Sequence, residues 1–310
     1  MSDWTTSTNP LLLRIAMTTA STPDLAAFEH CYRETLGYRT VETGTVGQEL
    51  ARSWAAPAAA GSGYCVMRPE GDDVAYVRAV EAPEVAGYRP LTTFGWNAFE
   101  IIVDDVHALA KRIGGSPLEV LDGPHPLKFM PSIVAMQVVG PGGECLYFTM
   151  ESGDRDASIL PRPGGFVGRT FIVVAGGPDF HAMLRWYVDT FQLRERPVRQ
   201  SKVAIIQRAQ GLDSEHTILL SAIGLRDHGN LLELDGYPTG SGLVAGPRPR
   251  PPGHLPPGNA IVSFDVADLA RYEALAIATP QVRPEAGYGG RRACTIIGPA
   301  GELVELIDAL

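Results

Sequence analysis

The feature that most constrains the fold is a stretch near the C-terminal end that also occurs in the first half of the chain. Residues 298–306 read GPAGELVEL, and residues 140–148 read GPGGECLYF. Proline and glycine favour a turn, because proline fixes φ and glycine tolerates positive φ. The alternation that follows predicts a strand. The chain therefore contains a repeat, and its two copies differ where Glu305 of one corresponds to Tyr147 of the other.

A second pair of segments repeats at nearly the same distance. Pro23-Asp24 and Pro178-Asp179, 155 residues apart (178 − 23), each precede apolar residues at helical spacing. An aspartate or threonine at such a point predicts a helix N-cap. The same offset relates Tyr32 to Tyr187 and Arg14 to Arg169.

The pattern around these markers predicts four β-α-β-β-β units and an α+β protein. We expect a disordered N-terminus over 1–10, a first domain over 11–150, a linker over 151–165 and a second domain over 166–310. Within the third unit, the β-branched run Val203 to Arg208 is interpreted as a strand.

The prolines between residues 246 and 258 exclude a central strand or helix there. We interpret this segment as a stiff surface connector, with a flap over a pocket as the alternative.

Composition excludes several classes of partner. The net charge of −9 argues against nucleic acid and against an anionic membrane surface. No apolar run is long enough to span a bilayer, and residues 1–10 lack the apolar segment of a signal peptide. Four widely spaced cysteines, without a CxxC pair, favour reduced thiols and a cytoplasmic protein over disulfides or a zinc site.

The helical stretches AAFEHCYRETLGY and FHAMLRWYVDTFQL, together with the two strand endings, resemble the vicinal oxygen chelate superfamily. This superfamily includes glyoxalase I, bleomycin-resistance proteins and extradiol dioxygenases. The resemblance covers nearly the whole chain and implies two tandem glyoxalase-like domains, each a curled mixed sheet that forms a cup. In this family the floor of the cup carries metal ligands on the first and last strand of each unit.

Carried over residue by residue, the resemblance places the site in the second domain. Glu305 matches the carboxylate of the final strand, and Glu233 resembles the glutamate ligand of glyoxalase I. Asn259 stands where a histidine is expected, and Arg169, or Thr170 with a one-residue slip, stands at the first position of the third unit. Glu233 and Glu305 are therefore expected to share one cup, as ligands of a divalent ion or as catalytic groups beside Arg169.

The first domain departs further from the family pattern. Asn97 or Ala98 stands at its histidine position and Tyr147 at its glutamate position, so no metal is expected there. Asn97, Tyr147, Asn259 and His254 of the proline-rich segment are candidate substrate-binding residues. For His254, however, an ordinary loop histidine is the simpler interpretation.

These residues favour an enzyme that acts on a small aromatic or carbonyl-bearing metabolite by proton transfer, as a lyase or isomerase. The first alternative is a divergent extradiol-like dioxygenase, although the two histidines of an iron site are missing. The second is a non-catalytic binding or resistance protein. Whether the chain forms a homodimer stays open.

Overall fold

The computed structural model describes residues 9–71, 75–128 and 130–309. The disorder expected for residues 1–10 falls largely on residues 1–8, which lie outside the described residues. The four units expected from the sequence are present, and each begins with a long strand.

The first unit contains β1 (Leu12–Thr22), α1 (Leu25–Cys31) with a π-helical turn (Tyr32–Leu36), β2 (Tyr38–Thr45), α2 (Gln48–Ser53), a 3-10 turn (Pro57–Ala59), β3 (Gly63–Pro69) and β4 (Tyr76–Glu81). The second contains β5 (Gly95–Val103), α3 (Val106–Ile113), β6 (Glu119–Leu127), β7 (Met130–Val139) and β8 (Cys145–Glu151).

The third unit contains β9 (Val167–Gly177), α4 (Phe180–Phe191), β10 (Arg199–Ser201), α5 (Ala204–Gln210), β11 (Ile218–Gly224) and β12 (Leu231–Gly236). The fourth contains β13 (Gly258–Val266), a 3-10 turn (Leu269–Tyr272), β14 (Gln281–Val282), β15 (Arg292–Ile297) and β16 (Leu303–Asp308).

Local signals place the helices correctly at both copies of the proline-aspartate motif. The Asp24 carboxylate accepts the backbone N–H of Ala27, and the Asp179 carboxylate accepts that of Ala182. The first helix ends at Gly37, whose φ of 75° is the left-handed conformation that glycine adopts without strain.

The prediction of a strand over Val203 to Arg208 is wrong, because these residues lie in helix α5. Ile205 and Ile206 pack into an apolar cluster on one side of the helix, and Gly211 ends it at a φ of 65°. Tertiary burial of this isoleucine pair therefore overrides the preference of β-branched residues for strands.

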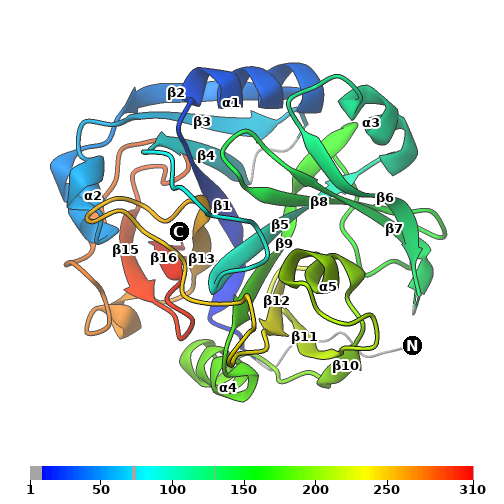
Figure 1. Cartoon of the computed structure of the whole chain (residues 1–310). Coiled ribbons are helices and arrows are strands. Elements are labelled where there is room, and N and C mark those ends of the chain that lie inside the picture. The colour runs from blue at the N-terminus through cyan, green and yellow to red at the C-terminus, as the bar shows by residue number, and fades with distance from the viewer. Residues whose placement is uncertain (1–8, 72–74, 129, 310) are drawn as a thin grey trace.

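The units form two eight-stranded mixed sheets, and each sheet joins units from different halves of the chain (Figure 1). The first and fourth units form the outer-unit sheet, with strand order β14-β15-β16-β13-β1-β4-β3-β2. The second and third units form the inner-unit sheet, with order β10-β11-β12-β9-β5-β8-β7-β6. The antiparallel pairs β1–β13 and β5–β9 connect the units within each sheet.

This topology corrects the expectation that consecutive units share a cup. The segment 151–165 connects β8 to β9 inside one sheet, so it does not separate two domains. The chain instead crosses between the sheets at 82–94 and at 237–257, and these two crossings touch each other through a bridge between Thr93 and Gly246. The proline-rich segment belongs to the second crossing.

One apolar core joins the outward faces of both sheets to helices α1, α3 and α4. The opposite, concave face of each sheet encloses a separate apolar cluster and is covered by a short helix, α2 over the outer-unit sheet and α5 over the inner-unit sheet. We call these two concave faces the outer cup and the inner cup. No helix of the described chain is long and apolar enough to cross a membrane.

Candidate functional site

The floor of the outer cup is a buried polar network centred on Glu305. The parallel registers place Glu305 of β16 beside Ser263 of β13, and Arg78 of β4 beside Thr19 of β1. Arg78 Nη2 lies 3.3 Å from Glu305 Oε2, which also accepts the Ser263 hydroxyl, and Arg78 Nε donates to Thr19 Oγ1. The four positions at the centre of this cup are thus bonded to one another.

Two aromatic residues close the network from above. Trp54 follows helix α2 and donates from its indole Nε1 to Glu305 Oε1, and the Tyr288 hydroxyl donates to the same oxygen at 2.7 Å. The Arg78 guanidinium stacks 4.5 Å from the Trp54 ring centre. Glu305 is 1% exposed and Arg78 2% exposed, so the outer cup is filled.

The inner cup carries a different set at the same four positions. The register of β5 with β8 places Glu100 beside Tyr147, and that of β9 with β12 places Val174 beside Glu233. Glu100, Tyr147 and Glu233 are half-buried on strands whose other central residues are mostly buried. The outward face of these strands lies in the shared core. The partial exposure of Glu100, Tyr147 and Glu233 therefore means that solvent reaches the concave face.

The inner-cup carboxyl groups lie in surroundings that favour the neutral form. Burial raises the pKa of Glu233 to about 7. Burial also raises the pKa of Glu100 to about 8; the neighbouring Glu233 carboxylate adds to this shift, and the hydrogen bond from the Thr149 hydroxyl opposes it. Carboxyl groups with such pKa values exchange protons near neutral pH, as a general acid or base requires.

Helix α5 forms the cover of the inner cup and is attached both to β6 and to the crossing at 82–94. Arg208 Nη2 donates to Asp122 Oδ2 of β6 at 2.6 Å, and Gln210 Nε2 donates to the Leu91 carbonyl oxygen at 2.8 Å. A surface depression of about 490 Å³ lies between α5, β6 and residues 89–92, and it includes Ile205, Leu121 and Val139.

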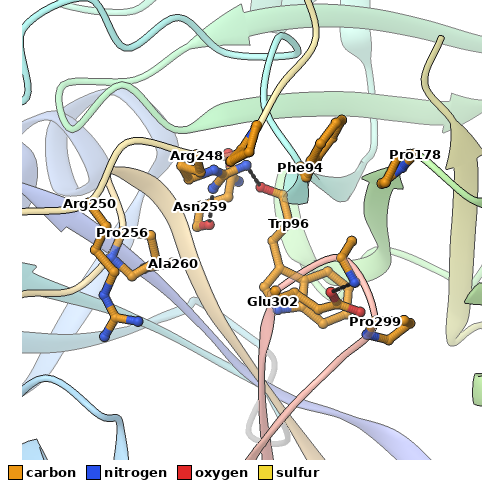
Figure 2. A pocket seen from close by; sticks show the side chains of 14 residues that line it. Phe94, Trp96, Pro178, Arg248, Arg250, Pro256, Asn259, Ala260, Pro299 and Glu302 are labelled. Carbon is orange, nitrogen blue, oxygen red and sulfur yellow. Dashed lines mark hydrogen bonds between the residues drawn. The ribbon is translucent and has the colours of Figure 1, made fainter. Parts of the chain in front are cut away.

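A third cavity lies where the two sheets meet, and Figure 2 shows it from close by. It has a volume of about 350 Å³ and is lined by the starts of β5 and β13, the turn before β16 and the proline-rich crossing. Arg248 of that crossing donates to backbone oxygens of Trp96, Asn259 and Pro257, so it fixes the crossing over the junction. Glu302, at the cavity edge, accepts the Tyr187 hydroxyl at 2.7 Å.

The sequence-predicted residues are divided among these three places. Glu305 lies in the outer cup, and Glu233 and Tyr147 lie in the inner cup, so the prediction that Glu233 and Glu305 share a cup is wrong. The reason is the pairing of units: β12 and β16 belong to different sheets. Because Tyr147 and Glu305 occupy equivalent positions on the last strands of the second and fourth units, the repeat itself is confirmed.

The remaining candidates lie away from both cup floors. Arg169 donates to Asn230 Oδ1 and to the Gly229 carbonyl oxygen, and the cation that binds Glu305 is Arg78. Asn259 binds both backbone groups of Cys145.

The other two candidates hold loops in place. The Asn97 amide donates to the Thr93 and Gly95 carbonyl oxygens. His254 is half-buried in the proline-rich crossing, and its carbonyl oxygen accepts Arg250 Nε.

Similarity to solved structures is found over the whole chain. Glyoxalase I from Zea mays superposes with a TM-score of 0.61 at 17% identity, covering 95% of this chain and 92% of that one. A dioxygenase candidate from Bacillus subtilis superposes with a TM-score of 0.59 at 12% identity, covering 97% and 86%. The chain has the vicinal oxygen chelate fold in tandem. A scan of family models gives no match, and neither does a search of curated proteins.

Because proteins with the vicinal oxygen chelate fold can bind a metal ion, we compared the side chains that each cup offers as ligands. In the outer cup both Glu305 oxygens already accept donors and a guanidinium stands at one of the four positions, so the residues do not fit a cation. The inner cup offers the Glu100 and Glu233 carboxylates, but Val174 supplies no ligand. Within residues 9–71, 75–128 and 130–309 no group of three or more His, Cys, Asp or Glu side chains could hold a metal ion.

Sequence reasoning missed Arg78, Glu100 and the closing aromatic pair. The repeat contained the signal for Arg78, because its offset from Glu233 is the same 155 residues (233 − 78) that relates the helix starts. Glu100 stands alone as an acidic residue within an apolar strand, which is the signal for a buried functional carboxyl group. Trp54 and Tyr288 come from connecting segments, and nothing in the sequence predicted their contact with Glu305.

Proposed function

We propose that the chain is an enzyme of the vicinal oxygen chelate type that moves a proton next to a carbonyl group, as an isomerase or lyase, with the inner cup as its active site. The observation that carries this proposal is the pair Glu100 and Glu233, with pKa values raised to about 8 and about 7, on a concave face that solvent reaches. At neutral pH such a pair contains both an acid and a base.

The two carboxyl groups take complementary roles. Among the described residues no hydrogen-bond donor is bound to the Glu233 carboxylate, so it is the base that removes a proton from the carbon next to the carbonyl. Glu100, which accepts the Thr149 hydroxyl and has the higher pKa, donates its proton to the carbonyl oxygen as the enol forms. If the carbon that loses its proton also carries a hydroxyl group, protonated Glu233 returns the proton to the former carbonyl carbon while that hydroxyl gives its proton to ionised Glu100, which gives an isomerase. If the next carbon carries a leaving group, that group departs with its bonding electrons and takes the proton from Glu233, while the enol proton returns to Glu100, which gives a lyase.

The walls of the inner cup favour a small apolar or aromatic substrate. The concave cluster contains Ile172, Val174, Ile205, Ile206 and Tyr147. Apolar walls with a few convergent polar groups are typical of small-molecule sites. Apolar walls also exclude water, which strengthens the electrostatic interactions between the substrate and the two carboxyl groups.

A carbon-acid exchange assay tests the proposal without knowledge of the natural substrate. Phenylacetaldehyde and acetophenone are incubated with the protein in D₂O, and exchange of the protons next to the carbonyl is followed by ¹H NMR. Glu233→Gln keeps the shape of the side chain and removes the base, so the catalysed exchange rate is expected to fall about 100-fold or more.

The matched control is Glu305→Gln, which makes the same change at the equivalent region of the outer cup. It is expected to retain the exchange activity of whatever fraction is folded. Equal loss in both variants, or catalysis that survives Glu233→Gln, would contradict the assignment of the inner cup as the active site. Absence of catalysed exchange in the wild type would instead favour the non-catalytic binding protein.

A further inference from the structure

The inner cup contains a third carboxyl group that the proposed proton transfer does not use. Asp235 lies two residues beyond Glu233 on β12, on the same concave face, and is 3% exposed. Its Oδ1 atom has no hydrogen-bond partner among the described residues. A buried carboxyl oxygen without a donor is costly, which points to a donor that a ligand supplies.

A second unpartnered group lies beside it. The Tyr237 ring lies over the backbone of Gly176: a Cβ at Gly176 would come within 2.6 Å of the tyrosine Cζ, the atom that carries the hydroxyl. Gly176 is the register partner of Asp235, so the hydroxyl end of Tyr237 lies near Asp235 on the concave face. That hydroxyl is buried and also has no hydrogen-bond partner among the described residues.

No ion pair joins the inner-cup carboxyl groups to a basic side chain among the described residues. Neighbouring carboxylates influence Glu100 and Asp235, whereas no lysine or arginine of the described chain influences the pKa of Glu100, Glu233 or Asp235. The Arg248 guanidinium opposes the burial that raises the pKa of Tyr237, but its donors are bound to backbone oxygens of the junction and to the Thr93 hydroxyl. Glu100, Glu233 and Asp235 are therefore not compensated by a cation, and burial raises the pKa of each of them.

We propose that the inner cup binds a substrate that carries an organic ammonium group, with the ammonium between Asp235 and the Tyr237 hydroxyl. An ammonium group donates three hydrogen bonds, and its positive charge would stabilise the ionised form of Asp235. The Tyr147 and Tyr237 rings add faces that attract a cation. The proposal rests on the proposed function, because the carbonyl group of the same substrate would then lie toward Glu100.

Calorimetric titration at pH 7.5 tests the charge requirement independently of turnover. The probes are benzylamine, benzyl alcohol and benzoate, which share a ring and differ in charge. We expect benzylamine to bind at least tenfold more tightly than benzyl alcohol and benzoate not to bind. Equal binding of amine and alcohol, or no binding of the amine, would overturn the proposal, while the exchange assay with Glu233→Gln decides the proposed function separately.

Two variants locate the ammonium. Asp235→Asn is expected to weaken benzylamine at least tenfold, whereas Asp189→Asn, which removes the same charge from the exposed face of α4, is expected to leave it unchanged. Tyr237→Phe removes a hydroxyl that has no partner within the described part of the chain, so it is expected to keep the fold and to weaken benzylamine binding several-fold. Unchanged affinity in both Asp235→Asn and Tyr237→Phe would overturn the placement.

A titration with MnCl₂ distinguishes an inorganic cation. If Mn²⁺ binds at micromolar concentration, loses affinity in Asp235→Asn and prevents benzylamine from binding, the carboxyl groups serve a metal ion and the organic-ammonium proposal is wrong. Failure of Mn²⁺ to compete, with benzylamine bound as expected, supports it.

Discussion

The outer and inner cups have the same strand arrangement and opposite electrostatics. In the outer cup, Arg78 and Glu305 neutralise each other, and Trp54 and Tyr288 complete a network that excludes solvent. In the inner cup, Glu233 stands at the position of Arg78, and no cation compensates it among the residues described. Different residues at the four equivalent positions, above all Glu233 in place of Arg78, thus distinguish a filled cup whose polar groups bond to one another from a cup that has no such network.

The comparison shows that a filled cup and an open cup need different contacts from the connecting segments of the chain. A buried ion pair must have all its donors and acceptors satisfied, and the outer cup obtains them from two connecting segments. The inner cup keeps Glu100 and Glu233 partly in contact with solvent, and protonation lowers the energetic cost of placing their carboxyl groups there.

The largest expected effect is the loss of the outer-cup cation. Arg78→Met leaves Glu305 buried without its charge partner, which is expected to cost roughly 3–5 kcal/mol of unfolding free energy. Urea denaturation measures this, and the double variant Arg78→Met, Glu305→Leu should recover much of the loss because both charges are removed. An unchanged midpoint for Arg78→Met would end the view that this pair holds the outer cup together.

The pH dependence of the unfolding free energy tests the carboxyl groups of the inner cup. The folded-state pKa values of Glu100 and Glu233, about 8 and about 7, lie above the ordinary value of 4.5. Their contribution is therefore fully present below about pH 4.5 and is lost as the pH rises through 7 to 8, because the folded state binds more protons than the unfolded state.

Removal of both ionisable groups should flatten this dependence. As the pH rises from 5 to 9, the unfolding free energy of the wild type is expected to fall relative to that of the Glu100→Gln, Glu233→Gln double variant. Thermal melts across this range measure it, with Glu84→Gln at an exposed site as the control. A constant difference across the range would show that these carboxyl groups titrate normally.

A smaller loss of unfolding free energy, equal in the two halves of the chain, is expected where both halves have the same tyrosine–glutamate hydrogen bond. The Tyr32 hydroxyl donates to Glu144 Oε1 and the Tyr187 hydroxyl to Glu302 Oε1, at repeat-related and buried positions. Tyr32→Phe and Tyr187→Phe are each expected to lower the unfolding free energy by about 1–3 kcal/mol, because a buried carboxyl group loses a donor. Chemical denaturation measures both, and a large difference between them would show that the two junctions are not equivalent.

The smallest effect concerns the cover of the inner cup. Arg208→Ala removes an exposed ion pair with Asp122, so the unfolding free energy should change by no more than about 1 kcal/mol. Local opening of α5 should nevertheless become easier, and faster amide hydrogen exchange over Ala204–Gln210 than in the wild type would detect it. Unchanged exchange there would mean that Gln210 and the isoleucine contacts hold the helix without the ion pair.

The sequence by itself determined the local and repeated parts of this protein. The Gly-Pro turns, the aspartate caps and the 155-residue offset are short-range chemistry, and they predicted the four units and the equivalence of Tyr147 and Glu305. They could not predict which units pair, because each first strand offers similar apolar and backbone groups to more than one partner.

Only the tertiary structure decided where the functional groups meet. The pairing of β1 with β13 brought Arg78 to Glu305, and that of β5 with β9 brought Glu100 to Glu233. These contacts join residues that are far apart in the chain. Because charge compensation depends on distance in space, the sequence does not show which charges compensate each other. The sequence could therefore name Glu233 and Glu305 as the important carboxylates, but the fold alone gave one of them a buried arginine and the other an open cup.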